Sequence, residues 1–171
     1  EPKQFYSRLA GKVAIITGAG AVRDAEHVGT GAAMAVWFAR EGAKISIVDL
    51  NTERGERTAK RIRDAGGEAI VVEANITSGE SCRNAVAKTV ETYGSVNILV
   101  NNVGANSASA GWVGGGKIDS LPENVWNEII ELNLTSAFLM SKAALPEMVK
   151  SGSSSIINIG SLSGLQAIGS T

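Results

Sequence analysis

The sequence lacks an excess of charge of either sign, and it lacks any long hydrophobic run. Its 171 residues include 16 basic and 17 acidic side chains, which leaves a formal net charge of −1. Nucleic acids and anionic membranes attract proteins with a basic excess, so neither is expected as a partner. No apolar run approaches the roughly 18 residues of a membrane span. The start, Glu1 to Gln4, does not resemble a signal peptide. The expected location is the cytoplasm.

Cysteine and histidine occur once each, which argues against two further kinds of site. Cys82 cannot form an internal disulfide, as expected in a reducing compartment. It lies in a helix-like stretch without neighbours that would activate a thiolate, so its expected role is structural. His27 has no second candidate ligand at metal-binding spacing, so no metal site is predicted.

The overall composition is that of one folded domain, which spans residues 1–171. Hydrophobic residues make up 44% of the chain and charged residues 19%, which is typical of globular proteins. Short β-branched runs alternate with longer amphipathic stretches. We predict strands at 13–16, 44–48, 69–72, 98–100 and 155–159, and helices at 32–40, 52–65, 77–93 and 120–150.

Two of these helix ends have local signals. Thr77 to Glu80 has the pattern of a capping box, and Gly66-Gly67 predicts the end of the second helix. Strands that alternate with helices indicate right-handed crossovers and a parallel sheet covered on both faces. The predicted fold class is therefore α/β, a doubly wound three-layer sheet.

A glycine-rich turn follows the first predicted strand and leads into the first predicted helix. Its residues are Thr17, Gly18 and Gly20, then Gly29, Thr30 and Gly31 farther along. Glycine permits a tight turn and lets a pyrophosphate approach the backbone, and a helix N-terminus favours an anion. The spacing departs from G-x-G-x-x-G by extra residues within 21–28. The turn predicts a dinucleotide site of the Rossmann kind.

Asp49 supports this interpretation and bears on the choice of cofactor. It ends the second strand 18 residues beyond Gly31, close to the roughly 20 expected for a ribose-binding acid. The extra residues therefore belong to the turn itself. A carboxylate accepts hydrogen bonds from a ribose 2′-hydroxyl and repels a 2′-phosphate, so NAD is favoured over NADP. No basic residue follows before Arg54, and Arg23 in the insertion leaves NADP as the alternative.

The glycine turn is the first of four elements that share their order with a known family. The others are Asn101-Asn102-Val103-Gly104 after the fourth strand, Asn133 in the long helix and Ser161 after the fifth strand. Together they resemble the short-chain dehydrogenase/reductase family over nearly the whole chain. The turn is similar to its T-G-x-x-x-G-x-G motif, broken by about seven residues, with Val103 in place of an alanine in the next motif. Asn75 stands where that family usually has an aspartate that faces the adenine.

The resemblance implies the reaction and the residues that serve it. Hydride would pass between a nicotinamide and the carbon of a small alcohol or carbonyl substrate. Ser161 would hold the substrate oxygen, and Asn133 would anchor a water in a proton relay. The implied cofactor contacts are Thr17, Gly18, Gly20, Gly29, Thr30, Gly31, Asp49, Leu50, Asn75, Ile76, Asn102, Val103 and Gly104.

The resemblance also has implications beyond these residues. It implies a homo-oligomer, commonly a tetramer, with the helix that contains Asn133 at one interface. Trp112 and Val113, in the loop 105–116, are expected to form one wall of a fairly apolar substrate pocket.

The family's Y-x-x-x-K segment would lie beyond Ser161 and past Thr171. Neither Tyr6 nor Tyr93 has a lysine four residues on, so neither replaces that tyrosine. The fifth strand would also be an apolar edge. We therefore expect the natural polypeptide to continue past Thr171, and these residues alone to be inactive. The leading hypothesis is an NAD-dependent alcohol dehydrogenase or carbonyl reductase. The alternatives are a non-catalytic dinucleotide-binding module, if the chain ends at Thr171, and a sugar epimerase or dehydratase.

Overall fold

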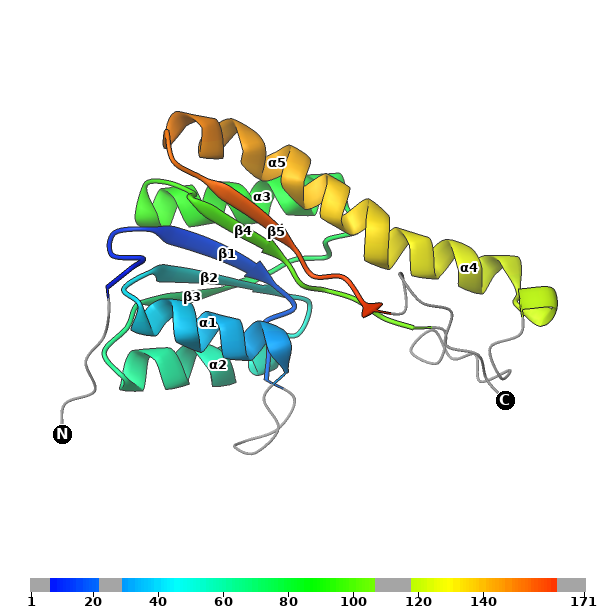
Figure 1. Ribbon diagram of the computed structural model, residues 1–171, viewed down its shortest axis with the longest axis horizontal. Coiled ribbons are helices and arrows are strands. Elements are labelled where there is room, and N and C mark those ends of the chain that lie inside the picture. Colours follow the sequence, from blue (N-terminus) through cyan, green and yellow to red (C-terminus); the bar gives the residue numbers. More distant parts are fainter. Residues whose placement is uncertain (1–6, 22–28, 107–117, 163–171) are drawn as a thin grey trace.

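A twisted parallel sheet with helices on both faces forms the centre of the molecule (Figure 1). The computed structural model describes residues 7–21, 29–106 and 118–162. The sheet has the order β3-β2-β1-β4-β5, and each neighbouring pair is parallel. The strands are β1 (Val13–Thr17), β2 (Lys44–Asp49), β3 (Ala69–Glu73), β4 (Ile98–Asn101) and β5 (Ser155–Asn158). The predicted doubly wound α/β fold is confirmed.

The two faces of the sheet have separate hydrophobic cores. Helices α1 (Thr30–Arg40) and α2 (Thr52–Asp64) cover one face, and α3 (Gly79–Tyr93) and α5 (Ser136–Lys150) cover the other (Figure 1). Successive residues of a strand point to opposite faces. Ile16 therefore belongs to the core under α1 and α2, while its neighbour Ile15 belongs to the core under α3 and α5. Burial on both faces explains why the central strands are continuous apolar runs.

One predicted helix end is confirmed and one is wrong. Gly66 has a φ of +84°, and the N–H of Gly67 donates to the carbonyl of Ile62 at 2.9 Å, which ends α2 as expected. The capping box at Thr77 to Glu80 does not form. Ser78 is the N-cap of α3 instead. The reason is that the Thr77 hydroxyl donates to Asn75 Oδ1 at 2.8 Å, so Thr77 belongs to the turn before the helix.

The long helical region is less regular than predicted. It begins with a single 3₁₀ turn, η1 (Ile118–Ser120), and regular helix starts only at α4 (Glu123–Ile130). A π turn, η2 (Glu131–Thr135), then joins α4 to α5. Such turns place an extra residue in a helix and are frequent at functional sites. Asn133 lies at the centre of this one.

Within the described ranges, no helix is long and apolar enough to cross a membrane. The same residues contain no group of three or more histidine, cysteine or acidic side chains that could hold a metal ion. Cys82 is buried, and its thiol donates to the carbonyl of Ile76 at 3.3 Å. Burial raises the pKa of that thiol, which keeps it protonated and fits a structural role.

Candidate cofactor and substrate site

The glycine turn lies where the carboxyl end of β1 meets the start of α1. Gly18 has a φ of +63°, and a Cβ on it would come within 2.7 Å of Val103 Cγ2. A Cβ on Gly31 would come within 2.5 Å of Asn102 Nδ2 and 2.6 Å of the Gly18 carbonyl. Both positions therefore require glycine, because the N-terminus of α1 packs closely against the ends of β1 and β4.

Asn102 and Thr17 tie the ends of β1 and β4 together. Asn102 Nδ2 donates to the carbonyls of Thr17 and Gly18, each at 3.1 Å. The Thr17 hydroxyl donates to the Val100 carbonyl at 3.3 Å and accepts from the Asn102 N–H at 3.0 Å. Thr17 is only 1% exposed, so it supports the turn from beneath rather than facing a ligand directly.

The N-terminus of α1 has the features of an anion site. Gly29 is its N-cap, with no side-chain cap, and no acidic residue lies in the first turn. A Cβ on Gly29 would meet nothing within 4 Å among the described atoms. Backbone N–H groups and the helix dipole favour a phosphate at such an end. These residues therefore fit the pyrophosphate of a dinucleotide.

Asp49 is fixed in place at the end of β2. Its Oδ2 accepts from the Gly20 N–H and its Oδ1 from the Asn51 N–H, both at 2.9 Å. A Cβ on Gly20 would come within 2.6 Å of Asp49 Oδ2 and 2.7 Å of Arg54 Cβ. The backbone N–H of Gly20 thus orients the Asp49 carboxylate, so Gly20 positions the acid at the end of β2.

A hollow of about 240 Å³ opens beside Asp49. It is lined by Gly18, Val48, Asp49, Leu50, Ala74, Asn75, Ile76, Val103 and Leu132. Leu50 is 70% exposed at its rim. Asn75 Oδ1 accepts from both the N–H and the hydroxyl of Thr77, at 3.1 and 2.8 Å. The group that Asn75 can offer a base is therefore its amide N–H₂.

A larger cavity of about 620 Å³ brings Asn133 and Ser161 to one place. It lies at the carboxyl ends of β4 and β5, beside the start of α1, and no charged side chain is among its described lining residues. The lining residues are Thr30, Asn102, Val103, Gly104, Ala105, Asn106, Asn133, Ile159, Gly160 and Ser161. The topology thus joins four predicted elements that are far apart in the sequence.

The amide of Asn133 is held from both sides. Its Oδ1 accepts from the Ala105 N–H at 3.0 Å. Its Nδ2 donates to the Ala105 carbonyl at 2.9 Å and to the Ile129 carbonyl at 2.8 Å. Asn133 therefore fixes the loop after β4 against the π turn, on the wall of the larger cavity.

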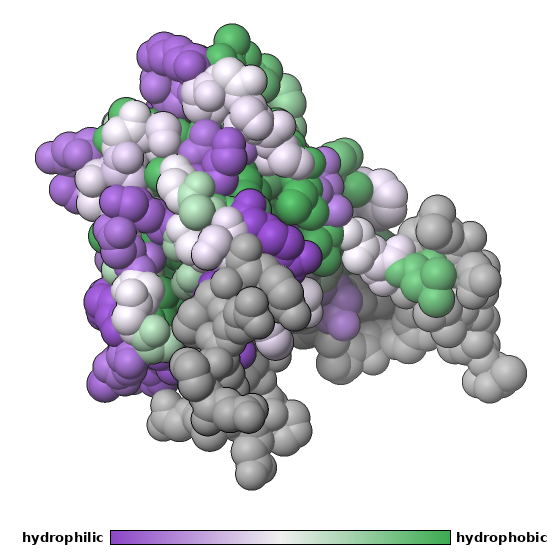
Figure 2. All heavy atoms as spheres, turned by 60° about the vertical axis from the view of Figure 1, so that its left-hand side comes forward, coloured by the Kyte–Doolittle hydropathy of each residue, from purple (hydrophilic) through white to green (hydrophobic). Residues whose placement is uncertain are grey.

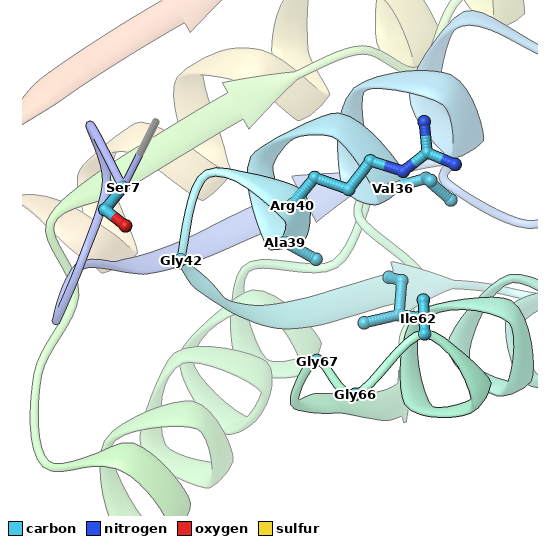
Figure 3. Close-up of a pocket in the computed structure, with 9 residues that line it drawn as sticks. Ser7, Val36, Ala39, Arg40, Gly42, Ile62, Gly66 and Gly67 are labelled. Carbon is cyan, nitrogen blue, oxygen red and sulfur yellow. The ribbon is translucent and has the colours of Figure 1, made fainter. Parts of the chain in front are cut away.

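The opposite end of the sheet contains none of the predicted site residues. A pocket of about 190 Å³ there is lined by the last turns of α1 and α2, with Arg40 and Ile62 among its residues (Figure 3). Tyr93 also lies at this end, with the Lys44 ammonium 5.6 Å from its ring centre. Burial raises the pKa of Tyr93 to about 12, which agrees with its exclusion as a proton donor.

One residue that supports the larger cavity was not among the predicted site residues. Several residues named in the sequence analysis lie outside the described residues. Asn101 Nδ2 donates to Asn158 Oδ1 at 2.8 Å and to Ser141 Oγ at 3.1 Å, which joins β4, β5 and α5 beneath the larger cavity. The sequence signal was a polar residue at the end of a buried strand. Outside the described residues are Tyr6, Arg23, His27, Trp112 and Val113.

A parallel sheet with a glycine turn, an acid at the end of β2 and two cavities at its carboxyl edge defines a dinucleotide-binding α/β protein. The short chain dehydrogenase family matches residues 12–171. The chain belongs to this family.

Named relatives and solved structures agree with this assignment. The chain is 43% identical over 159 residues to 2,5-dichloro-2,5-cyclohexadiene-1,4-diol dehydrogenase LinX of Sphingobium indicum, covering 93% of this chain and 58% of that one. It is 35% identical to 7alpha-hydroxysteroid dehydrogenase of Escherichia coli, covering 91% and 55%. A solved Burkholderia xenovorans structure described as a short-chain dehydrogenase/reductase has a TM-score of 0.83 and 42% identity, covering 93% and 60%. The chain thus spans somewhat over half the length of these relatives.

Proposed function

We propose that this chain is the cofactor-binding part of an NAD-dependent oxidoreductase that moves a hydride between the nicotinamide and a secondary alcohol or ketone. The observation that carries the proposal is the shared cavity of Asn133 and Ser161, which opens beside the N-terminus of α1. Family membership supports an oxidoreductase with a dinucleotide cofactor.

The bound nicotinamide would supply the hydride chemistry, and the chain's own residues would supply binding and orientation. The first turn of α1 would hold the pyrophosphate. Ser161 would donate a hydrogen bond to the substrate oxygen, where a fixed donor stabilises developing charge. Asn133 would hold the wall of the cavity in place through Ala105. The resemblance assigns the proton donor to a Y-x-x-x-K segment, and neither tyrosine of residues 1–171 has a lysine four residues on.

Asp49 supports NAD over NADP. Its carboxylate is fixed by two backbone N–H donors, so it cannot readily turn away from an incoming 2′-phosphate. We expect NAD to bind at least about tenfold more tightly than NADP, as roughly 1.4 kcal/mol of repulsion would produce. Titration of the full polypeptide with each cofactor measures this ratio.

The cavity and the names of the relatives support a proposal for the substrate class. A volume of about 620 Å³ and the absence of charge among its described lining residues suit a neutral molecule of some size. Two relatives are named as dehydrogenases of a cyclohexadiene diol and of a hydroxysteroid. We therefore propose a cyclic secondary alcohol.

The test is turnover by the full polypeptide with NAD and a panel of cyclic and linear secondary alcohols, followed by NADH absorbance. NADH formation with at least one cyclic alcohol supports the proposal. Tight NAD binding without turnover on the whole panel would instead favour a non-catalytic dinucleotide-binding module. Failure to bind either cofactor would contradict both.

The proposal includes a homo-oligomer in a reducing compartment. Apolar side chains lie exposed along α4 and α5, including Trp126, Phe138 and Leu145. Figure 2 shows apolar surface at the top of the molecule, the height at which Figure 1 places the end of α5.

The proposed reducing compartment is the cytoplasm, with which the free, buried thiol of Cys82 is compatible.

A further inference from the structure

Helix α2 holds the first half of the glycine turn by hydrogen bonds that sequence motifs do not predict. The Thr58 hydroxyl donates to the Ala19 carbonyl at 2.8 Å, and Arg57 Nε donates to the Ala21 carbonyl at 3.1 Å. The Ala21 N–H in turn donates to the Arg54 carbonyl at 3.0 Å. Three hydrogen bonds between α2 and the turn thus hold Ala19 and Ala21 in place.

The Thr58 bond is buried, which makes its loss costly. Thr58 is 0% exposed and Ala19 is 0% exposed, so water cannot replace the hydroxyl as a donor to the carbonyl. A buried carbonyl left without a partner destabilises the conformation that buries it. The position of Ala19, between Gly18 and Gly20, therefore depends on Thr58.

The bonds at Ala21 matter because of where this residue lies. It is the last described residue before the extra residues that lengthen the turn. A longer connection restrains its two ends less than a short one does. Arg57 and the Arg54 carbonyl supply that restraint at Ala21, and Arg57 is itself oriented by its ion pair with Glu53 at 2.8 Å.

We propose that Thr58 and Arg57 are positioning residues for cofactor binding, which preorganise residues 19–21 of the glycine turn before the dinucleotide arrives. This inference rests on the proposed function, because it takes the turn to be the pyrophosphate site. Binding to a preorganised turn avoids the cost of ordering it, so weakening the restraint raises the dissociation constant.

The first experiment compares Thr58→Val with Thr89→Val in the full polypeptide. Thr89 is a matched control, because it is also 0% exposed and its hydroxyl lies 2.7 Å from Ser46 Oγ, but it belongs to α3 on the other face of the sheet. Both variants lose a buried hydrogen bond and some thermal stability. Thr58→Val should raise the Kd for NAD about fivefold, and Thr89→Val should leave it within about twofold. Thr58→Ser keeps the hydroxyl and should restore the affinity.

A second pair tests Arg57, whose change leaves the core intact. Arg57→Met removes the donor to Ala21, while Glu53→Gln removes only the ion pair. We expect Arg57→Met to weaken NAD binding about threefold and Glu53→Gln to change it by less than about 1.5-fold.

Hydrogen exchange of the Gly20 and Ala21 amides, measured without cofactor, separates this proposal from the proposed function. Faster exchange in Thr58→Val, but not in Thr89→Val, supports the restraint even if the unchanged protein does not bind NAD. Unchanged exchange together with an unchanged Kd in Thr58→Val would overturn the inference. An equal loss of NAD affinity in Thr89→Val would overturn it as well.

Discussion

At the scale of single residues, three glycines of the turn serve three different contacts. Gly18 lies against Val103, Gly31 against Asn102, and Gly20 against Asp49. The sequence pattern predicts that glycine is needed in this turn, because the backbone must bend tightly there. It does not reveal which neighbour approaches each glycine, since those neighbours come from other strands.

Gly20→Ala tests the link between the turn and Asp49. The new methyl group would come within 2.6 Å of Asp49 Oδ2 and must displace the carboxylate. We expect the Kd for NAD to rise at least about tenfold, with a smaller rise for NADP because the repulsion of a 2′-phosphate also weakens. Titration with both cofactors measures the two values.

Gly79→Ala is the matched control for that change. Gly79 begins α3, and its nearest contacts to an added Cβ are ordinary ones at 3.5 Å. Its cofactor affinities should match those of the unchanged protein. Unchanged NAD and NADP affinities in Gly20→Ala would contradict the role given to Gly20.

Asn133→Asp tests the other side of the site at nearly constant shape. A carboxylate can still accept from the Ala105 N–H. It would also face the carbonyls of Ala105 and Ile129, which accept hydrogen bonds from Asn133 Nδ2 in the unchanged protein. Unpaired or repelled groups of this kind cost about 1–3 kcal/mol each. We expect a lower Tm and a fall in kcat of at least about tenfold.

Asn127→Asp makes the same change of charge on an exposed residue of α4, away from the cavity lining. Its kcat and Tm should stay close to those of the unchanged protein. If kcat in Asn133→Asp is also unchanged, Asn133 has no part in turnover.

At the scale of elements, the sequence predicts regular helices and strands better than it predicts their irregular parts. The β-branched runs and the glycines after α2 are local signals, and they place β1 and the end of α2 correctly. The π turn at Glu131–Thr135 has no such signal. It accompanies the bonds of Asn133 to Ala105, a partner 28 residues away in the sequence. The failed capping box has a similar cause, because Thr77 bonds to Asn75 instead.

The end of α1 provides a pH-dependent test at this scale. Glu41 is its C-cap, where the helix dipole disfavours a negative charge, and the Arg8 guanidinium compensates with bonds of 2.8 and 3.1 Å. The hydrogen bond from Arg8 holds the pKa of Glu41 below its ordinary 4.5. A lowered carboxyl pKa stabilises the fold above the ordinary value, and this stabilisation is lost as the pH falls through the folded-state value.

Arg8→Met should therefore lower the Tm at neutral pH, and the difference from the unchanged protein should shrink as the pH falls below 4.5. Thermal melts across that range measure it. Lys88→Met, which breaks the exposed pair with Glu91, should have a smaller effect because water screens that pair. A Tm difference for Arg8→Met that is constant with pH would contradict this account.

At the scale of the whole molecule, both cavities of the site lie at the carboxyl edge of the sheet. The strand order changes direction beside β1, whose neighbours are β2 and β4, and ligands of open α/β sheets bind at such a point. This position was predictable from the alternation of strands and helices. The volumes and the side chains that fill the wall were not, because they depend on how loops distant in sequence pack together.

Substitutions on the outer face of α5 test whether a second copy of the chain binds there. Leu134, Phe138, Leu145 and Val149 are 64%, 59%, 51% and 71% exposed. Phe138, Leu145 and Val149 lie on α5 at spacings of seven and four residues, which place them on one side of the helix, and Leu134 lies four residues before Phe138 in η2. Lys142 interrupts this exposed apolar stripe, with its ammonium 5.6 Å from the centre of the Phe138 ring. Such a stripe marks an interaction surface, and family resemblance favours an identical partner. We expect a homo-oligomer, and a double change of Phe138→Glu and Leu145→Glu should reduce it to a smaller species.

Light scattering coupled to size-exclusion chromatography measures the mass of each species. Trp37→Glu is the control, because Trp37 is 60% exposed on α1, across the sheet from the stripe, and its loss should leave the mass unchanged. The two changes replace apolar contacts by charged groups that lose hydration when buried, so even a large contact should dissociate. A monomeric unchanged protein, or a double variant that keeps its full mass, would show that this stripe is not the interface between copies.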